Sequence, residues 1–113
     1  MVKTIDIGGR PVKFKATAAV PRLYRIRYRR DIMRDMRDID AAVKAGDDMP
    51  VKMLQVFEDL AYTMAKHADP DNVPDSADEW LDQFDVFDIY QVFPQLAELW
   101  ADNMETLEKP KKK

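Results

Sequence analysis

The fold of this chain is organised around the stretch Asp78-Glu79-Trp80-Leu81-Asp82-Gln83-Phe84-Asp85-Val86-Phe87-Asp88-Ile89-Tyr90. Aromatic side chains offer the largest apolar surface to a core, whereas acids are costly to bury without a partner. We therefore expect a core-facing side packed against the helix that contains Met53 and Met64, made of Trp80, Leu81, Phe84, Phe87 and Tyr90. The other side then forms a negative surface of Asp78, Asp82, Asp85 and Asp88.

Helix start and stop signals surround this stretch. Ser76 followed by Glu79 is a capping box, which predicts a helix from Ala77 to about Phe84. Asp85 is placed to cap the next helix. Pro94 predicts a kink or break at 92–94, with helix on both sides, because proline disfavours helical geometry in the residue before it. The apolar pattern continues through Trp100 and fades from about Asn103, so we expect residues 103–113 to be a flexible basic tail.

The N-terminal segment has the alternating pattern of a β-hairpin. Ile5 and Ile7 share one face of the first strand, and Val12 and Phe14 share a face of the second. Gly8-Gly9 between them provides the positive φ angles of a tight turn. Pro11 lacks an N–H group and therefore predicts an edge position. We expect a hairpin over residues 2–16, packed on helices because an isolated hairpin is only marginally stable.

Residues 18–102 have helical periodicity. A first helix opens at Thr17 or Ala18, and a second is capped by Asp31. Residues 20–45 could form one bent helix or two separate helices. The pattern favours a break or kink near Arg29-Arg30. We expect the second helix to end at Gly46.

The next helix is capped by Asp48, with Met49-Pro50 in its first turn, and runs to about Ala68. It is the most apolar helix and should be central. Residues 69–75 are a loop by composition. The chain is therefore expected to be mainly α, with four to five helices and an N-terminal β-hairpin packed on the helical core, in a single domain over residues 1–102.

The length and composition of the chain limit the kinds of protein that it can be. With 113 residues and no cysteine, the chain suits one small domain without disulfides or thiolate metal sites. The N-terminus lacks the apolar run of a signal peptide, and no segment approaches the roughly 20 apolar residues of a transmembrane helix. These features predict a soluble intracellular protein that does not bind membranes.

Charge is divided sharply along the chain. Residues 1–46 carry a net charge of +7, residues 47–108 carry −14, and the last five residues contain four lysines. Such asymmetry favours either attraction between the halves within one fold or association with another copy or partner.

The basic half concentrates arginines between residues 22 and 37. This segment has three interpretations: a solvated face paired with the aspartates at 31, 35 and 38, a nucleic-acid site, or a docking surface for an acidic partner. The interleaved aspartates and the acidic overall charge disfavour nucleic acid. The expected partner-binding residues are Arg22, Arg25, Arg29, Arg30, Asp82, Asp85 and Asp88.

Catalytic and metal-binding patterns are weak. His67 is the single histidine, at a helix end where it would favour the terminal dipole, and no nucleophile lies at a useful spacing. Asp69, Asp71 and Asp75 resemble part of a Ca²⁺ loop but lack its glycine and bidentate glutamate. We expect no enzyme activity, metal or cofactor. The methionines at helical spacing either fill core gaps or form an adaptable surface for apolar segments; they are Met33, Met36, Met49, Met53 and Met64.

Several motifs, taken in order, resemble a known family. They are the N-terminal hairpin with Lys15-Ala16-Thr17-Ala18-Ala19, then Ala61-Tyr62-Thr63-Met64-Ala65-Lys66-His67-Ala68-Asp69-Pro70, Glu79-Trp80-Leu81-Asp82-Gln83-Phe84, Phe87-Asp88-Ile89-Tyr90 and Pro94-Gln95-Leu96-Ala97-Glu98-Leu99-Trp100. Over about residues 2 to 102 the chain resembles the tail assembly chaperones of long-tailed phages and prophages of Gram-positive bacteria. The 22–37 segment is more basic than this family pattern.

The resemblance implies a function without chemistry. Such chaperones bind the long, aggregation-prone tape-measure protein, recruit tail-tube protein, act in the bacterial host cytoplasm and are absent from the mature virion. The resemblance also implies a longer form made by ribosomal frameshifting, which the A-rich codons of Lys111-Lys112-Lys113 would suit; the alternative is a simple solubilising end. Opposite charges on the two halves further predict salt-sensitive self-association. The main alternative function is a small nucleic-acid-binding or regulatory module that uses the arginine-rich helix.

Overall fold

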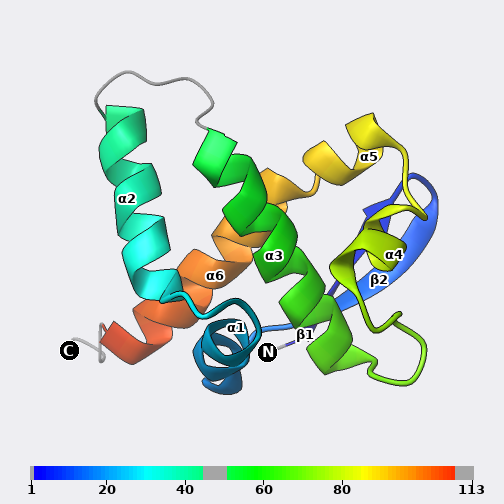
Figure 1. Ribbon diagram of the computed structural model, residues 1–113, viewed down its shortest axis with the longest axis horizontal. Coiled ribbons are helices and arrows are strands. Elements are labelled where there is room, and N and C mark those ends of the chain that lie inside the picture. The colour runs from blue at the N-terminus through cyan, green and yellow to red at the C-terminus, as the bar shows by residue number, and fades with distance from the viewer. Residues whose placement is uncertain (1, 45–50, 109–113) are drawn as a thin grey trace.

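The computed structural model describes residues 2–44 and 51–108 (Figure 1). The described residues form two strands, four helices of ten residues or more, and two helices of five residues. Those elements are β1 (Val2–Ile7), β2 (Arg10–Lys15), α1 (Ala19–Tyr28), α2 (Ile32–Lys44), α3 (Val51–Ala68), α4 (Ala77–Leu81), α5 (Val86–Tyr90) and α6 (Phe93–Glu108). The expectation of a mainly α fold with an N-terminal hairpin is confirmed.

The hairpin forms as its sequence predicts. β1 and β2 pair antiparallel, with Ile7 opposite Arg10 and Ile5 opposite Val12. Gly8 and Gly9 in the turn have φ angles of 60° and 89°, which are favourable for residues without a Cβ atom. Pro11 is tolerated because β2 has only β1 beside it in the sheet. The buried side chains of the hairpin, Ile5, Ile7 and Phe14, face the helices.

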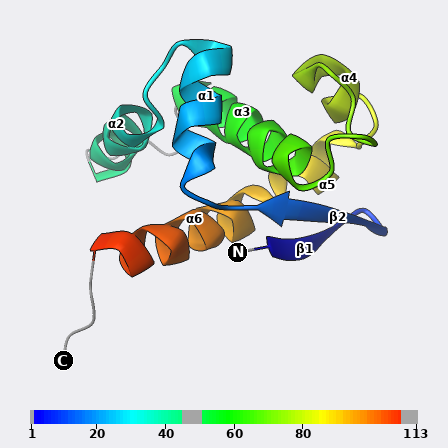
Figure 2. The same cartoon turned by 90° about the horizontal axis from the view of Figure 1, so that it is seen from below.

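Helix α3 is the centre of the molecule, as expected from its apolar sequence. It crosses in front of α6 and the hairpin in Figure 1, and Figure 2 shows both on the same side of it. The six residues 60–65 of α3 are all buried, so neighbours surround this part of the helix on every side. Helix α1 packs beside α3, and the Tyr62 hydroxyl of α3 donates to the Pro74 carbonyl of the 69–76 loop at 2.6 Å.

The organising stretch divides between α4 and α5. The Ser76 side chain accepts a hydrogen bond from the Glu79 N–H at 3.1 Å, which confirms the N-terminal cap of α4. Helix α4 ends at Leu81, three residues earlier than expected. Asp85 is the N-cap residue of α5 by position, but its side chain makes no capping hydrogen bond.

Trp80 is the core residue of this stretch. Its ring lies 6.3 Å from Phe14, 6.1 Å from Tyr62 and 5.1 Å from Phe84 between centroids. It therefore joins the hairpin, α3 and the α4–α5 connection in one aromatic cluster. Leu81 and Phe84 are half-buried against the same core.

Two aromatic residues of α5 depart from the prediction. Phe87 is 80% exposed and Tyr90 is 38% exposed, whereas Ile89 is buried. In a helix, residues two apart point in nearly opposite directions, so the buried Ile89 points away from Phe87. The core accepts Ile89 together with Val92 and Phe93, so the aromatic face of α5 turns to solvent.

Helix α6 also differs from the expectation at its C-terminal end. A break between two helices is present, but it lies at residues 91–92 rather than 92–94, and Phe93 is already helical. Pro94 lies in the first turn of α6, where its missing N–H costs little. The helix continues to Glu108, so residues 103–108 are helical rather than part of a flexible tail. The predictions for Gly46, Asp48, Met49-Pro50 and Lys111–Lys113 fall outside the described residues.

Candidate binding surfaces

The first candidate site is the junction between α1 and α2. Arg29 ends α1 in the left-handed conformation, with a φ of 56°, which confirms the predicted break. The Met33 N–H donates to the Asp31 side chain at 3.0 Å and starts α2. Arg30 lies between these two signals, so its side chain is aimed by the turn itself.

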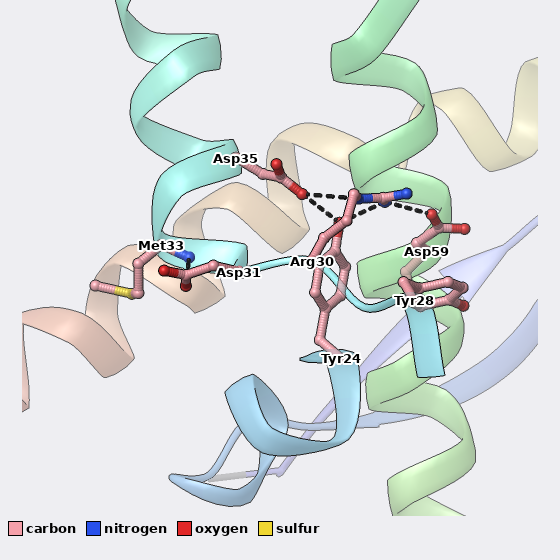
Figure 3. A network of polar contacts seen from close by, with 7 residues as sticks. All are labelled: Tyr24, Tyr28, Arg30, Asp31, Met33, Asp35 and Asp59. Atoms are coloured by element: carbon pink, nitrogen blue, oxygen red, sulfur yellow. Dashed lines mark hydrogen bonds and ion pairs between the residues drawn. The ribbon is translucent and has the colours of Figure 1, made fainter. Parts of the chain in front are cut away.

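Arg30 is the hub of a polar network that joins three helices (Figure 3). Its Nε donates to Asp35 of α2 at 3.0 Å, and its Nη2 donates to Asp59 of α3 at 2.7 Å. Nη2 also donates to the Tyr24 hydroxyl at 2.7 Å, and that hydroxyl donates to Asp35 at 2.9 Å. The guanidinium therefore links α1, α2 and α3.

Burial sets the protonation of this network. It raises the pKa of Tyr24 well above its ordinary value and raises the pKa of Tyr28 to about 12, so both hydroxyls stay protonated. Burial also raises the pKa of Asp59, and the hydrogen bond and charge of Arg30 offset part of that rise. Burial lowers the pKa of Arg30, but the hydrogen bonds that it donates to Tyr24, Asp59 and Asp35 outweigh this effect and raise the pKa. The network therefore has a structural role, because it holds α1, α2 and α3 together.

The predicted arginine surface is consequently divided. Arg22, Arg25 and Arg29 are exposed on α1, whereas Arg30 is half-buried in the network. The guanidinium of Arg27 lies 5.0 Å from the centre of the Tyr62 ring. Arg30 forms ion pairs with Asp35 and Asp59 of its own chain, whereas its role in binding a partner stays a prediction.

The predicted acidic surface is also only partly formed. Asp82 and Asp85 are exposed, but Asp88 is half-buried with its carboxylate directly over Gly8 of the hairpin turn. Figures 1 and 2 place α4 and α5 at one end of the molecule and α1 and α2 away from them. Within one chain these elements lie apart, and the attraction between the basic and acidic halves is seen instead in the ion pair of Arg30 with Asp59.

A second candidate site is an apolar groove of about 300 Å³ between α3, α5 and α6. We call it the α3–α6 groove. Aromatic and aliphatic side chains dominate its lining, which consists of Met53, Leu54, Phe57, Tyr90, Phe93, Pro94 and Ala97. The Phe57 and Phe93 rings stack at 5.5 Å and Tyr90 lies 5.5 Å from Phe93, so the aromatic floor is preformed. Met53 lines the groove, which favours the hypothesis that methionines form an adaptable surface for apolar segments. Met64 is buried and fills the core instead.

A third candidate site is a larger hollow of about 570 Å³ between α1 and the C-terminal half of α3. We call it the α1–α3 hollow. Leu23 and Ile26 give it an apolar wall, and Arg27, Lys66 and His67 also line it. The Lys66 ammonium is held by the carbonyls of Pro70 and Val73 and by Asp75. The hollow thus combines an apolar wall with a cationic edge.

His67 has a structural contact rather than the helix-dipole role that its position suggested. A hydrogen bond of 3.0 Å joins its Nε2 atom to the Thr17 hydroxyl, which also accepts from the Ala19 N–H at the start of α1. Burial, and then the charge of Lys15, lower the pKa of His67 below its ordinary value of 6.5. The neutral ring therefore connects the start of α1 to the end of α3.

This contact predicts a pH dependence of stability. Because the pKa of His67 is lower in the folded chain, the unfolded chain binds the proton more tightly, and stability falls as pH drops below about 6.5. The urea midpoint of the wild type should therefore fall more between pH 7 and pH 5 than that of His67→Gln, whose amide can still hydrogen-bond. Parallel pH curves for the two proteins would contradict this assignment.

Two of the three aspartates in the loop, Asp69 and Asp75, make contacts within the chain, and Asp71 is exposed. Asp69 accepts both hydrogen bonds from the Asn72 amide at 3.1 Å, and Asp75 pairs with Lys66 at 3.0 Å. Across residues 2–44 and 51–108 there is no cluster of three His, Cys, Asp or Glu side chains suited to a metal ion. In the same ranges no helix is both long and apolar enough to span a bilayer.

Comparison of the chain with protein-family models, with characterised proteins and with solved structures finds no match. The surfaces above therefore rest on the geometry of this chain alone. Sequence reasoning missed the α3–α6 groove, although a signal existed. The spacing of Ile89, Val92, Phe93 and Leu96 indicates which side of α5 and α6 faces inward, and so which residues are left exposed.

Proposed function

We propose that the chain is a non-enzymatic tail assembly chaperone, which binds a tape-measure protein and recruits tail-tube subunits during tail assembly. The observation that carries the proposal is the open, aromatic-floored α3–α6 groove. An amphipathic helix binds such a groove through apolar side chains about one turn apart. The resemblance of the ordered motifs over residues 2 to 102 supplies the identity of the client.

Further features support a holding function. The exposed apolar residues Val86 and Phe87 extend the apolar surface of α5 beyond the groove. The polar network around Arg30 is taken up by its own partners and has a structural role, whereas the α3–α6 groove offers an apolar surface on which a partner can dock. A protein that shields a long apolar helix needs such surfaces and no chemistry. Its expected location is the bacterial host cytoplasm, outside the mature virion.

A co-expression experiment tests the proposal. The chain is produced together with the tape-measure protein of the same phage or prophage, and the soluble fraction of that client is measured. Tyr90→Glu places a charge on the groove floor and should reduce the soluble client severalfold, because a buried unpaired charge opposes docking. Gln91→Glu adds the same charge at the neighbouring exposed position and should retain wild-type activity.

The outcomes are distinct. Equal client solubility with and without the wild-type chain would reject the chaperone function. Equal activity of Tyr90→Glu and wild type would keep the chaperone but move its client away from the groove. The nucleic-acid alternative predicts tight DNA binding that weakens steeply with salt, which a gel shift measures. We expect no such shift, since Arg30 is already bound within the fold and the chain has a net charge of −3.

A further inference from the structure

The outer face of α5 carries two exposed apolar residues, which we call the Val86–Phe87 knob, and acidic residues border it. Val86 is 68% exposed and Phe87 is 80% exposed, although both are large apolar side chains. Asp82 and Asp85 are exposed beside them. No lysine or arginine occurs in the sequence between Lys66 and Lys109. Arg10 of β2 reaches this border from the hairpin, but its guanidinium donates to Gln83 at 2.7 Å and lies over the Phe84 ring. Exposed aromatic residues of this kind are typical anchors of protein interfaces.

The α1–α3 hollow has the complementary properties. Its wall of Leu23 and Ile26 is apolar, and its volume of about 570 Å³ has room for an aromatic side chain. Arg27 lines the hollow, and the exposed Arg22 lies one helical turn before Ile26. An apolar knob bordered by carboxylates therefore meets both an apolar wall and guanidinium groups in the hollow.

We propose that the occupant of the α1–α3 hollow is the Val86–Phe87 knob of a second copy of this chain. Figures 1 and 2 place α5 at one end of the molecule and α1, with the end of α3, at another. One copy therefore cannot fill its own hollow. Each contact leaves a free knob on one copy and a free hollow on the other, so association is head to tail and can extend.

The small size of the contact sets its strength. The contact of one knob with one hollow buries an area at the low end of the range for protein interfaces. Association is therefore weak and depends on concentration. The carboxylate–guanidinium pairs at the border are near the surface, so salt weakens the contact. The inference does not depend on the proposed function, because self-association is measured without any client.

Three single variants test the contact by sedimentation velocity over a range of concentrations at low and high salt. Phe87→Ser removes the knob, and Ile26→Glu, at a position that is 60% exposed, blocks the hollow. Both should stay folded by circular dichroism and lose association by tenfold or more. Val2→Ser changes a 56% exposed apolar residue on the hairpin and should associate like wild type.

Mixing the two defective variants gives the sharpest result. Phe87→Ser keeps a working hollow and Ile26→Glu keeps a working knob, so an equimolar mixture should form a 1:1 pair that cannot extend. The proposal is overturned if the wild type stays monomeric at low salt and high concentration. It is equally overturned if Phe87→Ser associates like wild type or if the mixture stays monomeric.

Discussion

Replacing Arg30 by methionine is expected to destabilise the fold by about 3 kcal/mol, the lower end of the cost of breaking a buried ion pair. The side chains of Asp35 and Asp59 are only 5% and 14% exposed, so each would lose its cation without gaining full hydration. The Tyr24 hydroxyl would also lose a donor at 2.7 Å. The lower end applies because the Arg30 side chain itself is 29% exposed.

Urea denaturation of Arg30→Met and Arg25→Met separates this effect from the loss of a charge. Arg25 is exposed on α1, so its variant should keep a midpoint close to wild type. A triple variant, Arg30→Met with Asp35→Asn and Asp59→Asn, should recover part of the lost stability, because the two buried negative charges that Arg30 balanced are also removed. If Arg30→Met and Arg25→Met unfold at the same urea concentration, the network does not stabilise the fold.

Trp80→Ala is expected to cost about 3–5 kcal/mol, the usual range for removing a large buried aromatic side chain. Trp80 is 2% exposed and packs against Phe14, Tyr62 and Phe84. Its loss leaves a cavity where the hairpin, α3 and the α4–α5 connection meet. The free energy of unfolding of a small domain is only about 5–15 kcal/mol in total. The hairpin should therefore detach from the helices, and unfolding should become less cooperative.

The matched control for Trp80→Ala lies seven residues along the same stretch. Phe87→Ala removes another aromatic ring, but from a position that is 80% exposed, so its stability should stay within about 0.5 kcal/mol of wild type. Thermal melts followed by circular dichroism measure both. A sharp wild-type melt for Trp80→Ala would show instead that the aromatic cluster belongs to an interface.

Local signals explain which parts of the fold could be predicted. The Gly8-Gly9 turn, the Ser76 cap, the break at Arg29-Arg30 and the Pro94 break each depend on the backbone preferences of a few neighbouring residues. The structure confirms the first three, and it places the interruption before Pro94 at residues 91–92. The mainly α class follows from the same signals together with helical periodicity.

Contacts between distant residues explain what could not be predicted. Arg30 and Asp59 are 29 residues apart, and nothing in the local pattern distinguishes Arg30 from its exposed neighbour Arg29. The extent of α6 to Glu108 has a different reason. Once a helix has begun, each added residue costs little, so a weak apolar pattern does not end it.

The stretch from Asp78 to Tyr90 shows where the two kinds of information divide. The sequence by itself determined that it is helical, interrupted near Asp85, apolar on one side and acidic on the other, because these properties depend on neighbouring residues. Only the tertiary structure decided that Trp80 is buried and Phe87 is exposed. A five-residue helix has no stable orientation of its own, so the packing of Ile89, Val92 and Phe93 into the core sets which aromatic ring meets water.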